Sequence, residues 1–312
     1  MDVVVAGATG QQGGAVVDHL LDGNHGDFEV YALSRSPKSD ACQVLEERGA
    51  TTVGSDLSDK ETFRSTVENA DGVFCVTSFA HAGTDGEIEH GTNMAEVAAD
   101  VGIEHFVFSS VGGAERDSGV PHFESKYQVE QRISELDLPA TIIRPAAFMQ
   151  NFEGQREAIL DGTLAGPLEE GVSLQRVDVD SVGALTAEAF ADPERYRDEA
   201  IELASDEHTL EEAAAVFSEV TGVDVEAEHL SPEVARGQIG EEYTIMYEWF
   251  NEHGYGADIK ALRREHDIEF TSLDENLRKQ GWPSSYWTVV EQSINYLGSP
   301  HLRMDRTDVH DT

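Results

Sequence analysis

The chain has 312 residues, of which 39% are hydrophobic, so it is long enough to bury a large core. It carries 61 acidic against 21 basic residues, and the lack of a basic patch argues against direct nucleic-acid binding. We expect no signal peptide, and the sequence has no apolar run long enough to span a membrane. Its two cysteines, Cys42 and Cys75, cannot form a disulfide framework, so we expect a protein of the reducing cytoplasm.

The formal net charge of −40 is spread along the whole chain and does not form a separate acidic tail. This pattern is typical of proteins from salt-in halophiles, whose acidic surfaces keep them in solution at molar salt. The Debye length is then about 3 Å, so repulsion between like charges is screened. We therefore expect a halophilic protein, since a nucleic-acid mimic would need its acidic residues gathered on one face.

The first seventeen residues contain a strand, a glycine-rich turn and the start of a helix. Residues 2–6 are mainly Val and Ala, as in a fully buried strand, and residues 15–21 have an apolar helical face. Between them lie Gly7, Gly10 and Gly13, which would let the backbone approach a pyrophosphate at the helix N-terminus. This context predicts a dinucleotide-binding unit, and a tight turn without a ligand is the alternative.

The strand expected over residues 28–33 is followed by basic residues instead of the acidic residue that binds the ribose of NAD. Arg35 and Lys38 stand close together in a chain with few basic residues. This favours a bound anion, the 2′-phosphate of NADP, over a solvated turn.

Strands and helices alternate up to about residue 148, which predicts an α/β fold with a doubly wound parallel sheet. Further strands are expected over residues 50–53, 72–76, 104–108 and 140–144, and helices over 87–101 and 122–136. Ser58 and Glu61 have the spacing of a capping box for a helix ending near Asn69. Ligand-binding positions are expected in the loops at the carboxyl ends of the strands, namely Asp56 and Leu57 on the adenine side and Thr77, Ser78 and Phe79.

Beyond residue 150 the alternation loosens. We expect a dinucleotide-binding domain over residues 1–150, with residues 173–205 as a later segment of the same domain. A smaller lobe is expected over 151–298 and a flexible tail over 299–312. Helices are expected over residues 151–160, 180–190, 210–221 and 241–253, and strands over 173–177 and 200–204. The last helix carries five large apolar residues, which form either the core of the lobe or a pocket wall over the nicotinamide: Tyr243, Met246, Tyr247, Trp249 and Phe250.

Six segments together resemble one protein family: GATGQQGGAVV, SRSPKS, HGTNMAEVAADVGIEHFVFSSV, HFESKYQVEQRI, TIIRPAAFMQNF and EWFNEHGYGADIKALRREH. They are similar to the NmrA-like branch of the atypical short-chain dehydrogenases, and within it to the HSCARG-type redox sensor proteins. The resemblance extends to about residue 284. It implies a Rossmann domain that binds NADP(H), a smaller, mainly helical C-terminal lobe and a cleft between them.

The same resemblance implies which residues bind the dinucleotide. The pyrophosphate is expected to contact Gly7, Thr9, Gly10, Gln11, Gln12 and Gly13. The 2′-phosphate is expected to contact Arg35, with Lys38 as a helper. The ribose is expected to be lined by Thr77, Ser78 and Phe79. The residues expected beside the nicotinamide are Pro145, Ala147 and Phe148, with Asn151 and Phe152 beyond them.

Active short-chain dehydrogenases carry Tyr-x-x-x-Lys on one helix, where the lysine lowers the pKa of the phenol and the tyrosine transfers a proton. Here the lysine is present as Lys126, whereas His122 stands in place of the tyrosine. We expect Lys126 to bind the nicotinamide ribose; the alternative is an exposed lysine paired with Glu130. His122 is either a solvated residue at the helix start or an acid that replaces the phenol.

Because the tyrosine is missing, we predict a redox-sensing regulator that binds NADP(H) with little or no turnover. The alternative is an NADPH-dependent oxidoreductase acting on a small quinone, carbonyl or enone. The predicted partners are the dinucleotide and either a protein or such a substrate, and a homodimer is left open. The histidines do not lie at ligand spacing with cysteines or carboxylates, so no metal site is expected.

We predict that the stability of this chain depends on molar salt, because a net charge of −40 opposes compaction unless it is screened. The melting temperature should rise steeply between low and molar potassium chloride. Sucrose in place of the salt is the control for a general solute effect. A melting temperature that stays flat across the salt range would contradict the prediction.

Overall fold

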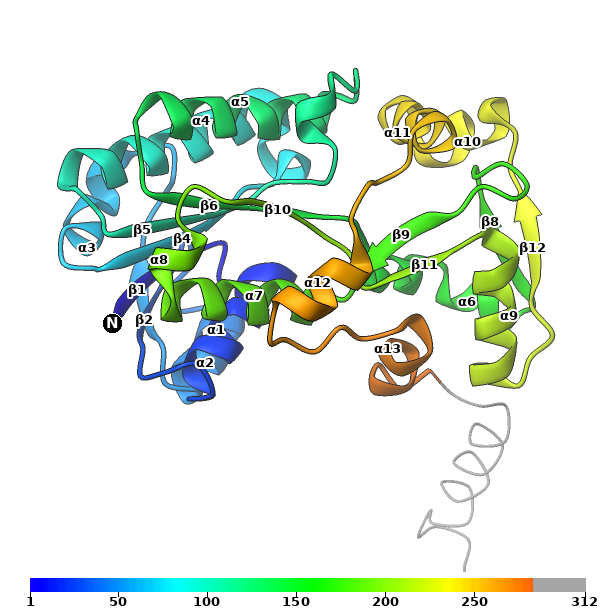
Figure 1. Ribbon diagram of the computed structural model, residues 1–312, viewed down its shortest axis with the longest axis horizontal. Coiled ribbons are helices and arrows are strands. Elements are labelled where there is room, and N and C mark those ends of the chain that lie inside the picture. Colours follow the sequence, from blue (N-terminus) through cyan, green and yellow to red (C-terminus); the bar gives the residue numbers. More distant parts are fainter. Residues whose placement is uncertain (283–312) are drawn as a thin grey trace, which may run out of the picture.

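The computed structural model describes residues 1–282, and its centre is a seven-stranded sheet with helices on both faces (Figure 1). The strands follow the order β10-β6-β5-β4-β1-β2-β3, and every neighbouring pair is parallel. This confirms the doubly wound fold predicted from the sequence, with the strand order reversing between β1 and β4. The strands are β1 (Asp2–Ala6), β2 (Glu29–Ser34), β3 (Thr51–Gly54), β4 (Gly72–Val76), β5 (His105–Ser109), β6 (Ala140–Pro145) and β10 (Ala200–Leu203).

Both faces of the central strands are covered, which explains their nearly continuous apolar sequences. Val3, Val4 and Val5 of β1 are all fully buried, because alternate side chains point into opposite helix layers. One layer contains α1, α2 and α7, and the other contains α3, α4 and α5 (Figure 1). These helices are α1 (Gln11–Leu21), α2 (Asp40–Glu47), α3 (Arg64–Val67), α4 (Phe79–Val101), α5 (Pro121–Glu135) and α7 (Val179–Ala191).

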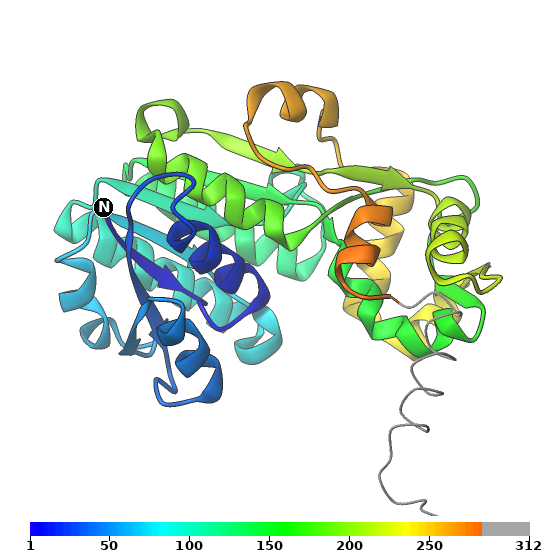
Figure 2. The ribbon, with the colours of Figure 1, turned by 90° about the horizontal axis from the view of Figure 1, so that it is seen from below.

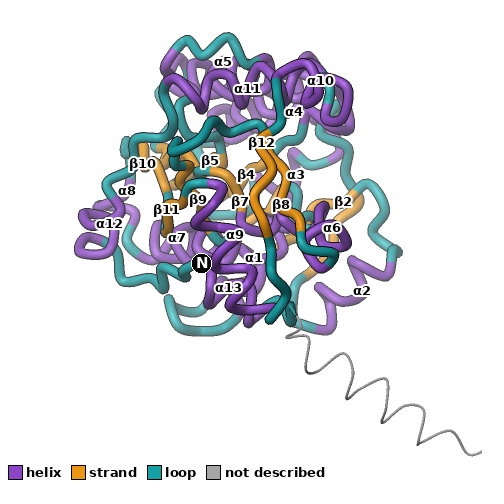
Figure 3. The backbone as a smooth tube through the Cα atoms, turned by 90° about the vertical axis from the view of Figure 1, so that its right-hand side faces the viewer, coloured by secondary structure: helices purple, strands orange, loops and turns teal. Residues whose placement is uncertain are grey.

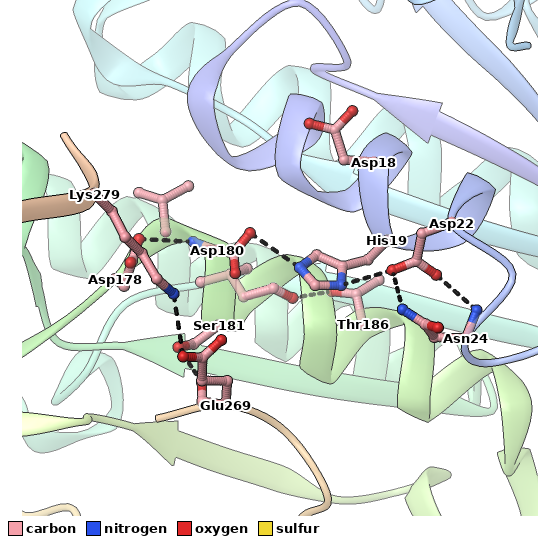
Figure 4. Close-up of polar contacts among 12 residues, drawn as sticks. Asp18, His19, Asp22, Asn24, Asp178, Asp180, Ser181, Thr186, Glu269 and Lys279 are labelled. Carbon is pink, nitrogen blue, oxygen red and sulfur yellow. Dashed lines mark hydrogen bonds and ion pairs between the residues drawn. The ribbon is translucent and has the colours of Figure 1, made fainter. Parts of the chain in front are cut away.

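Helix α7 follows the first six sheet strands in the chain, yet it lies directly against α1 (Figure 2). A Cβ on Gly183 would lie 2.5 Å from the carbonyl oxygen of Ala15, so the two helix backbones touch there. Nearby, Nε2 of His19 lies 3.0 Å from Oδ1 of Asp180, and this hydrogen bond raises the pKa of His19 (Figure 4). The strand β10 follows α7 in the chain and pairs with β6 at the edge of the main sheet.

The remaining elements form a smaller lobe to the right of the main sheet in Figure 1. It contains a three-stranded sheet in the order β11-β9-β7 and a parallel pair, β12-β8. These strands are β7 (Ala147–Phe148), β8 (Thr163–Gly166), β9 (Leu174–Val177), β11 (Asp206–His208) and β12 (Glu226–His229). The helices of this part are α6 (Arg156–Leu160), α9 (Leu210–Thr221), α10 (Pro232–Ile239), α11 (Glu241–Glu252) and α13 (Leu273–Lys279).

Three helices, α8, α12 and α11, connect the lobe to the main domain. α8 (Pro193–Tyr196) and α12 (Ile259–Glu265) bury Tyr196 and Leu262 in the core that α1 and α7 also share. On the other side, α11 lies beside α5 at the top of Figures 1 and 3. The lobe is therefore attached to the main domain above and below the end of the sheet.

The predicted capping box at Ser58 is wrong. The hydroxyl and N–H of Ser58 both donate to Asp56, and neither bonds Glu61. Asp59 caps a 3₁₀ turn at Lys60–Thr62 instead, and α3 is a single helical turn.

Two helix starts also differ from the prediction. α4 begins at Phe79, not at residue 87, and Gly83 interrupts it with φ 68° and ψ 175°, a conformation that favours glycine. The helix predicted from Asn151 begins as a 3₁₀ segment at Met149–Gln155. The tail predicted over residues 299–312 lies outside the described residues.

None of the helices within residues 1–282 combines the length and the hydropathy needed to cross a membrane.

Candidate functional site

The loop between β1 and α1 brings two backbone segments into direct contact. Gly7 has φ +83°, and a Cβ on Gly13 would lie 2.2 Å from the carbonyl oxygen of Gly7. The helix is capped by Gly10, which offers no side chain to the first N–H groups of α1. These donors therefore face an open loop at a positive helix end, which fits the pyrophosphate of a dinucleotide.

A groove crosses the carboxyl ends of the strands on both sides of this loop. Its end beside β2 is a cavity of about 410 Å³. Arg35, Asp56 and Leu57 line this cavity at the positions where the sequence predicts the adenosine half of the cofactor. Lys38 is exposed and is not part of the lining, whereas His90 of α4, which the sequence analysis did not single out, is.

The other end of the groove, between α5, β6 and α11, is a larger cavity of about 740 Å³. It shares the phosphate loop with the first cavity and adds side chains from both the main domain and the lobe. The predicted residues that line it are Gly7, Thr9, Gly10, Gln11, Gln12, Gly13, Arg35, Thr77, Ser78, Phe79, His122, Lys126, Pro145, Ala147, Phe148 and Asn151.

Phe152 was expected near the nicotinamide, and this is wrong. Its ring is buried in the core of the lobe, with an edge contact to Phe217 at a centroid distance of 5.0 Å. The guanidinium of Arg176 lies 4.8 Å from the ring centroid of Phe152. The 3₁₀ segment that starts at Met149 turns Phe152 away from the groove while Asn151 stays on its lining.

Lys126 is almost buried, with 8% of its surface exposed, and its ammonium is held between β4 and β5. Nζ donates to the carbonyl oxygens of Thr77 at 2.7 Å and Ser109 at 3.3 Å, and lies 3.2 Å from Oε1 of Glu87. With Oγ1 of Thr77 at 3.2 Å, four acceptor atoms surround the three N–H donors of this ammonium. The alternative of an exposed lysine paired with Glu130 is therefore wrong.

Glu87, which the sequence analysis did not identify, is the buried counter-charge of this site. It is fully buried on α4, where it also accepts a hydrogen bond from Ser125 of α5. A carboxylate without a partner at such a depth would cost several kcal/mol, so the ion pair with Lys126 compensates both charges. Glu130 is paired elsewhere, with Nη2 of Arg144 at 2.6 Å.

His122 is enclosed by side chains, so its interpretation as a solvated residue at a helix start is wrong. Its ring stacks on Phe79 at a centroid distance of 4.6 Å, and Nδ1 lies 2.8 Å from Oε1 of Glu242. Burial lowers the pKa of His122, while the hydrogen bond to Glu242 acts in the opposite direction. The aromatic contacts and the lobe carboxylate together fix this imidazole on the lining of the larger cavity.

Helix α11 serves as both core and cavity wall. Trp249 and Phe250 are buried against Phe123 of α5, while the half-buried Tyr247 lines the cavity together with Tyr255, which follows the helix. Burial raises the pKa of both phenols, so they are neutral at physiological pH. Within residues 1–282 their hydroxyls have no hydrogen-bond partner, which leaves them free to bind a ligand.

Both cysteines are buried and unpaired. Burial raises the pKa of Cys75 to about 12, so its thiol is protonated and unreactive at physiological pH. Among the described residues, no three His, Cys, Asp or Glu side chains are grouped to hold a metal ion.

The sequence profile of the NmrA-like family matches residues 1–279. An NmrA-like family domain-containing protein of Dictyostelium discoideum is 31% identical over 299 residues, which covers 89% of this chain and 97% of that protein.

Two proteins that have been solved with bound dinucleotides share the fold. Triphenylmethane reductase of Citrobacter sp., solved with NADP(H), has a TM-score of 0.77 and 20% identity and covers 89% of this chain and 99% of its own. NmrA, a negative transcriptional regulator solved with NADP, has a TM-score of 0.70 and 20% identity and covers 94% and 97%. NmrA has also been solved with NAD, with a TM-score of 0.72, 18% identity and the same coverage.

We predict that Lys126→Met destabilises the fold by about 3–5 kcal/mol, because it leaves Glu87 as an unpaired buried charge. Denaturant unfolding in molar salt measures this loss. The double variant Lys126→Met/Glu87→Gln should recover most of it, since no net charge is then buried.

Lys60→Met is the matched control, because Lys60 pairs with Glu96 at a partly exposed site. Its loss should stay within about 1 kcal/mol. Equal losses for Lys126→Met and Lys60→Met, or no recovery in the double variant, would contradict the buried ion pair.

Proposed function

This chain belongs to the NmrA-like family, whose profile covers its NAD(P)-binding fold, and we propose that it is an NADPH-dependent reductase of a small apolar acceptor. The observation that carries the proposal is the size and lining of the larger cavity. At about 740 Å³ it lies in the upper range of ligand pockets, and it extends from the phosphate loop past Pro145 and Phe148 to Tyr247 and Tyr255 of the lobe. This supports a site for a second small molecule beside the cofactor.

The lining of this cavity suits a flat, uncharged acceptor. Its wall combines aromatic rings from α11 with a few polar atoms, notably the free hydroxyls of Tyr247 and Tyr255. Ligand sites of this kind use apolar walls for affinity and isolated polar groups for orientation. Small quinones, carbonyls and enones have the matching chemistry, with a flat body and one or two oxygen acceptors.

Two residues of this chain would act at the reacting centre. When bound, a reduced nicotinamide supplies a hydride there. Lys126 would orient the nicotinamide ribose, which requires its ammonium to exchange a protein contact for a ribose hydroxyl. His122 would supply the proton that accompanies the hydride, in place of the missing tyrosine.

We also propose NADP(H), and not NAD(H), as the cofactor of this chain. Arg35 lines the adenosine cavity directly after β2, where an NAD-binding domain would carry an acidic residue. Triphenylmethane reductase was solved with NADP(H), and NmrA with either NADP or NAD, so the fold accommodates both dinucleotides. The two unpaired, buried cysteines agree with the cytoplasmic location expected from the sequence.

A redox-sensing regulator is the second candidate, and one observation favours it. All three protons of the Lys126 ammonium are already bound by the protein, as suits a structural role in a site without turnover. Such a sensor would respond through its dinucleotide and not through a thiol, because Cys75 is buried and protonated. NmrA provides the precedent of a regulator with this fold.

The decisive experiment is incubation with NADPH and a panel of quinones, aldehydes and enones in molar potassium chloride, following the absorbance of the reduced nicotinamide. We expect oxidation that requires both the protein and one class of acceptor. Calorimetric binding of NADPH without oxidation by any acceptor would reject the reductase and support the sensor. The same assay on heat-denatured protein is the control.

We predict that Arg35→Ala weakens NADP binding by about 10- to 100-fold, the loss of one charge-assisted phosphate contact of roughly 1.5–3 kcal/mol. Binding of NAD, which lacks the 2′-phosphate, should change little. Lys38→Ala is the matched control, since this exposed lysine is outside the cavity lining. Equal weakening of NADP and NAD by calorimetry would contradict the assignment.

A further inference from the structure

We propose that Glu242 is a positioning residue that holds the His122 imidazole as the proton donor of the reduction. The inference rests on the reductase function proposed above. His122 belongs to α5 of the main domain, whereas Glu242 belongs to α11 of the lobe, 120 residues later in the chain. The two helices meet through Phe123 and Trp249, whose ring centroids lie 5.6 Å apart, so the lobe completes the reacting centre.

The contact determines which nitrogen of the ring exchanges its proton. A carboxylate only accepts hydrogen bonds, so Nδ1 of His122 carries a hydrogen whether the ring is neutral or charged. The proton that the ring gains and loses is therefore the one on Nε2. Within the described part of the chain Nε2 has no hydrogen-bond partner, and the ring lines the larger cavity while Glu242 does not.

Neighbouring rings keep the imidazole in this orientation. Phe79 stacks on it with an interplanar angle of 17°, and Phe123 meets it edge-on at a centroid distance of 5.0 Å. Lys126 lies one helical turn further along α5 and lines the same cavity. The donor nitrogen and the proposed ribose ligand thus face one space, and Glu242 stands behind the ring.

The proton transfer breaks one bond and forms one. The Nε2–H bond of the imidazolium breaks, its electron pair stays on the nitrogen, and an O–H bond forms on the acceptor oxygen. The hydride that the acceptor gains comes from the reduced dinucleotide. His122 then takes a replacement proton from solvent.

The charges that face His122 come from three helices. Burial lowers the pKa of the imidazole most, Glu242 of α11 and Glu87 of α4 raise it, and Lys126 of α5 lowers it. Removing the charge of Glu242 takes away the strongest opposing effect. The pKa of His122 must then fall further, and the protonated donor is lost at a lower pH.

The test compares Glu242→Gln with Glu241→Gln, a matched control that removes the same charge from the neighbouring residue, which pairs with Arg236. Two quantities are measured: the pH profile of kcat/KM, and the NMR titration of His122 in cofactor-free protein, assigned with His122→Asn. In Glu242→Gln both midpoints should move down by about one pH unit. Glu241→Gln should leave both unchanged, and Glu242→Asp should restore part of the shift.

The outcomes separate this inference from the proposed function. A variant Glu242→Gln with a lower melting temperature but an unmoved pH profile and titration would show a merely structural contact and overturn the inference. Equal shifts in Glu241→Gln would assign the effect to net charge and also overturn it. If the unmodified protein reduces no acceptor, the reductase and its proton donor fall together, while the titration still decides whether Glu242 controls the imidazole.

Discussion

The structure depends on two places where backbone meets backbone without an intervening Cβ. At the first, Gly13 of α1 touches the carbonyl oxygen of Gly7, which holds the N-terminus of α1 close to the end of β1, where it faces the groove. At the second, Gly183 of α7 touches the carbonyl oxygen of Ala15 on the other side of α1. β1, α1 and α7 are therefore held at fixed positions relative to one another. The strand β10, which follows α7 in the chain, reaches the sheet edge beside β6.

The buried charges near the groove are arranged in compensating pairs. Lys126 is balanced by Glu87 and Arg144 by Glu130, although acidic residues outnumber basic ones almost threefold in this chain. The acidic side chains in excess therefore lie mainly at the surface, and the buried charges of the site are balanced. Arg35 has no ion-pair partner within residues 1–282, so it and the N-terminus of α1 remain to attract an anionic ligand.

The sequence was sufficient for the parts of the structure that depend on local chemistry. The apolar run of β1 and the glycines after it are encoded in adjacent residues and were predicted where they occur, whereas α1 begins at Gln11, before the predicted start at Ala15. Lys126 was identified because it stands at the lysine position of the Tyr-x-x-x-Lys pattern on one predicted helix. The alternation of strands and helices was enough to predict a doubly wound parallel sheet, which the structure has.

The partners of these residues could not be predicted, because they come from other elements. Glu87 lies one helix earlier than Lys126, and Glu242 lies in the lobe, far from His122 in sequence. In a chain with 61 acidic residues, no pattern distinguishes the two carboxylates that are brought into the site. Helix starts failed for a different, local reason: Ser58 bonds Asp56 two residues earlier, and the positive φ of Gly83 lets α4 continue back to Phe79.

The burial of both cysteines has a practical consequence for observing the lobe. Cys42 and Cys75 are the chain's two thiols, and each has 0% of its surface exposed. A single cysteine introduced on the exposed side of α11 would therefore be the one site that reacts with a maleimide or a spin label in the folded protein. With a second such site on α4, distance measurements by electron paramagnetic resonance would follow the separation of lobe and main domain directly, without first removing any native residue.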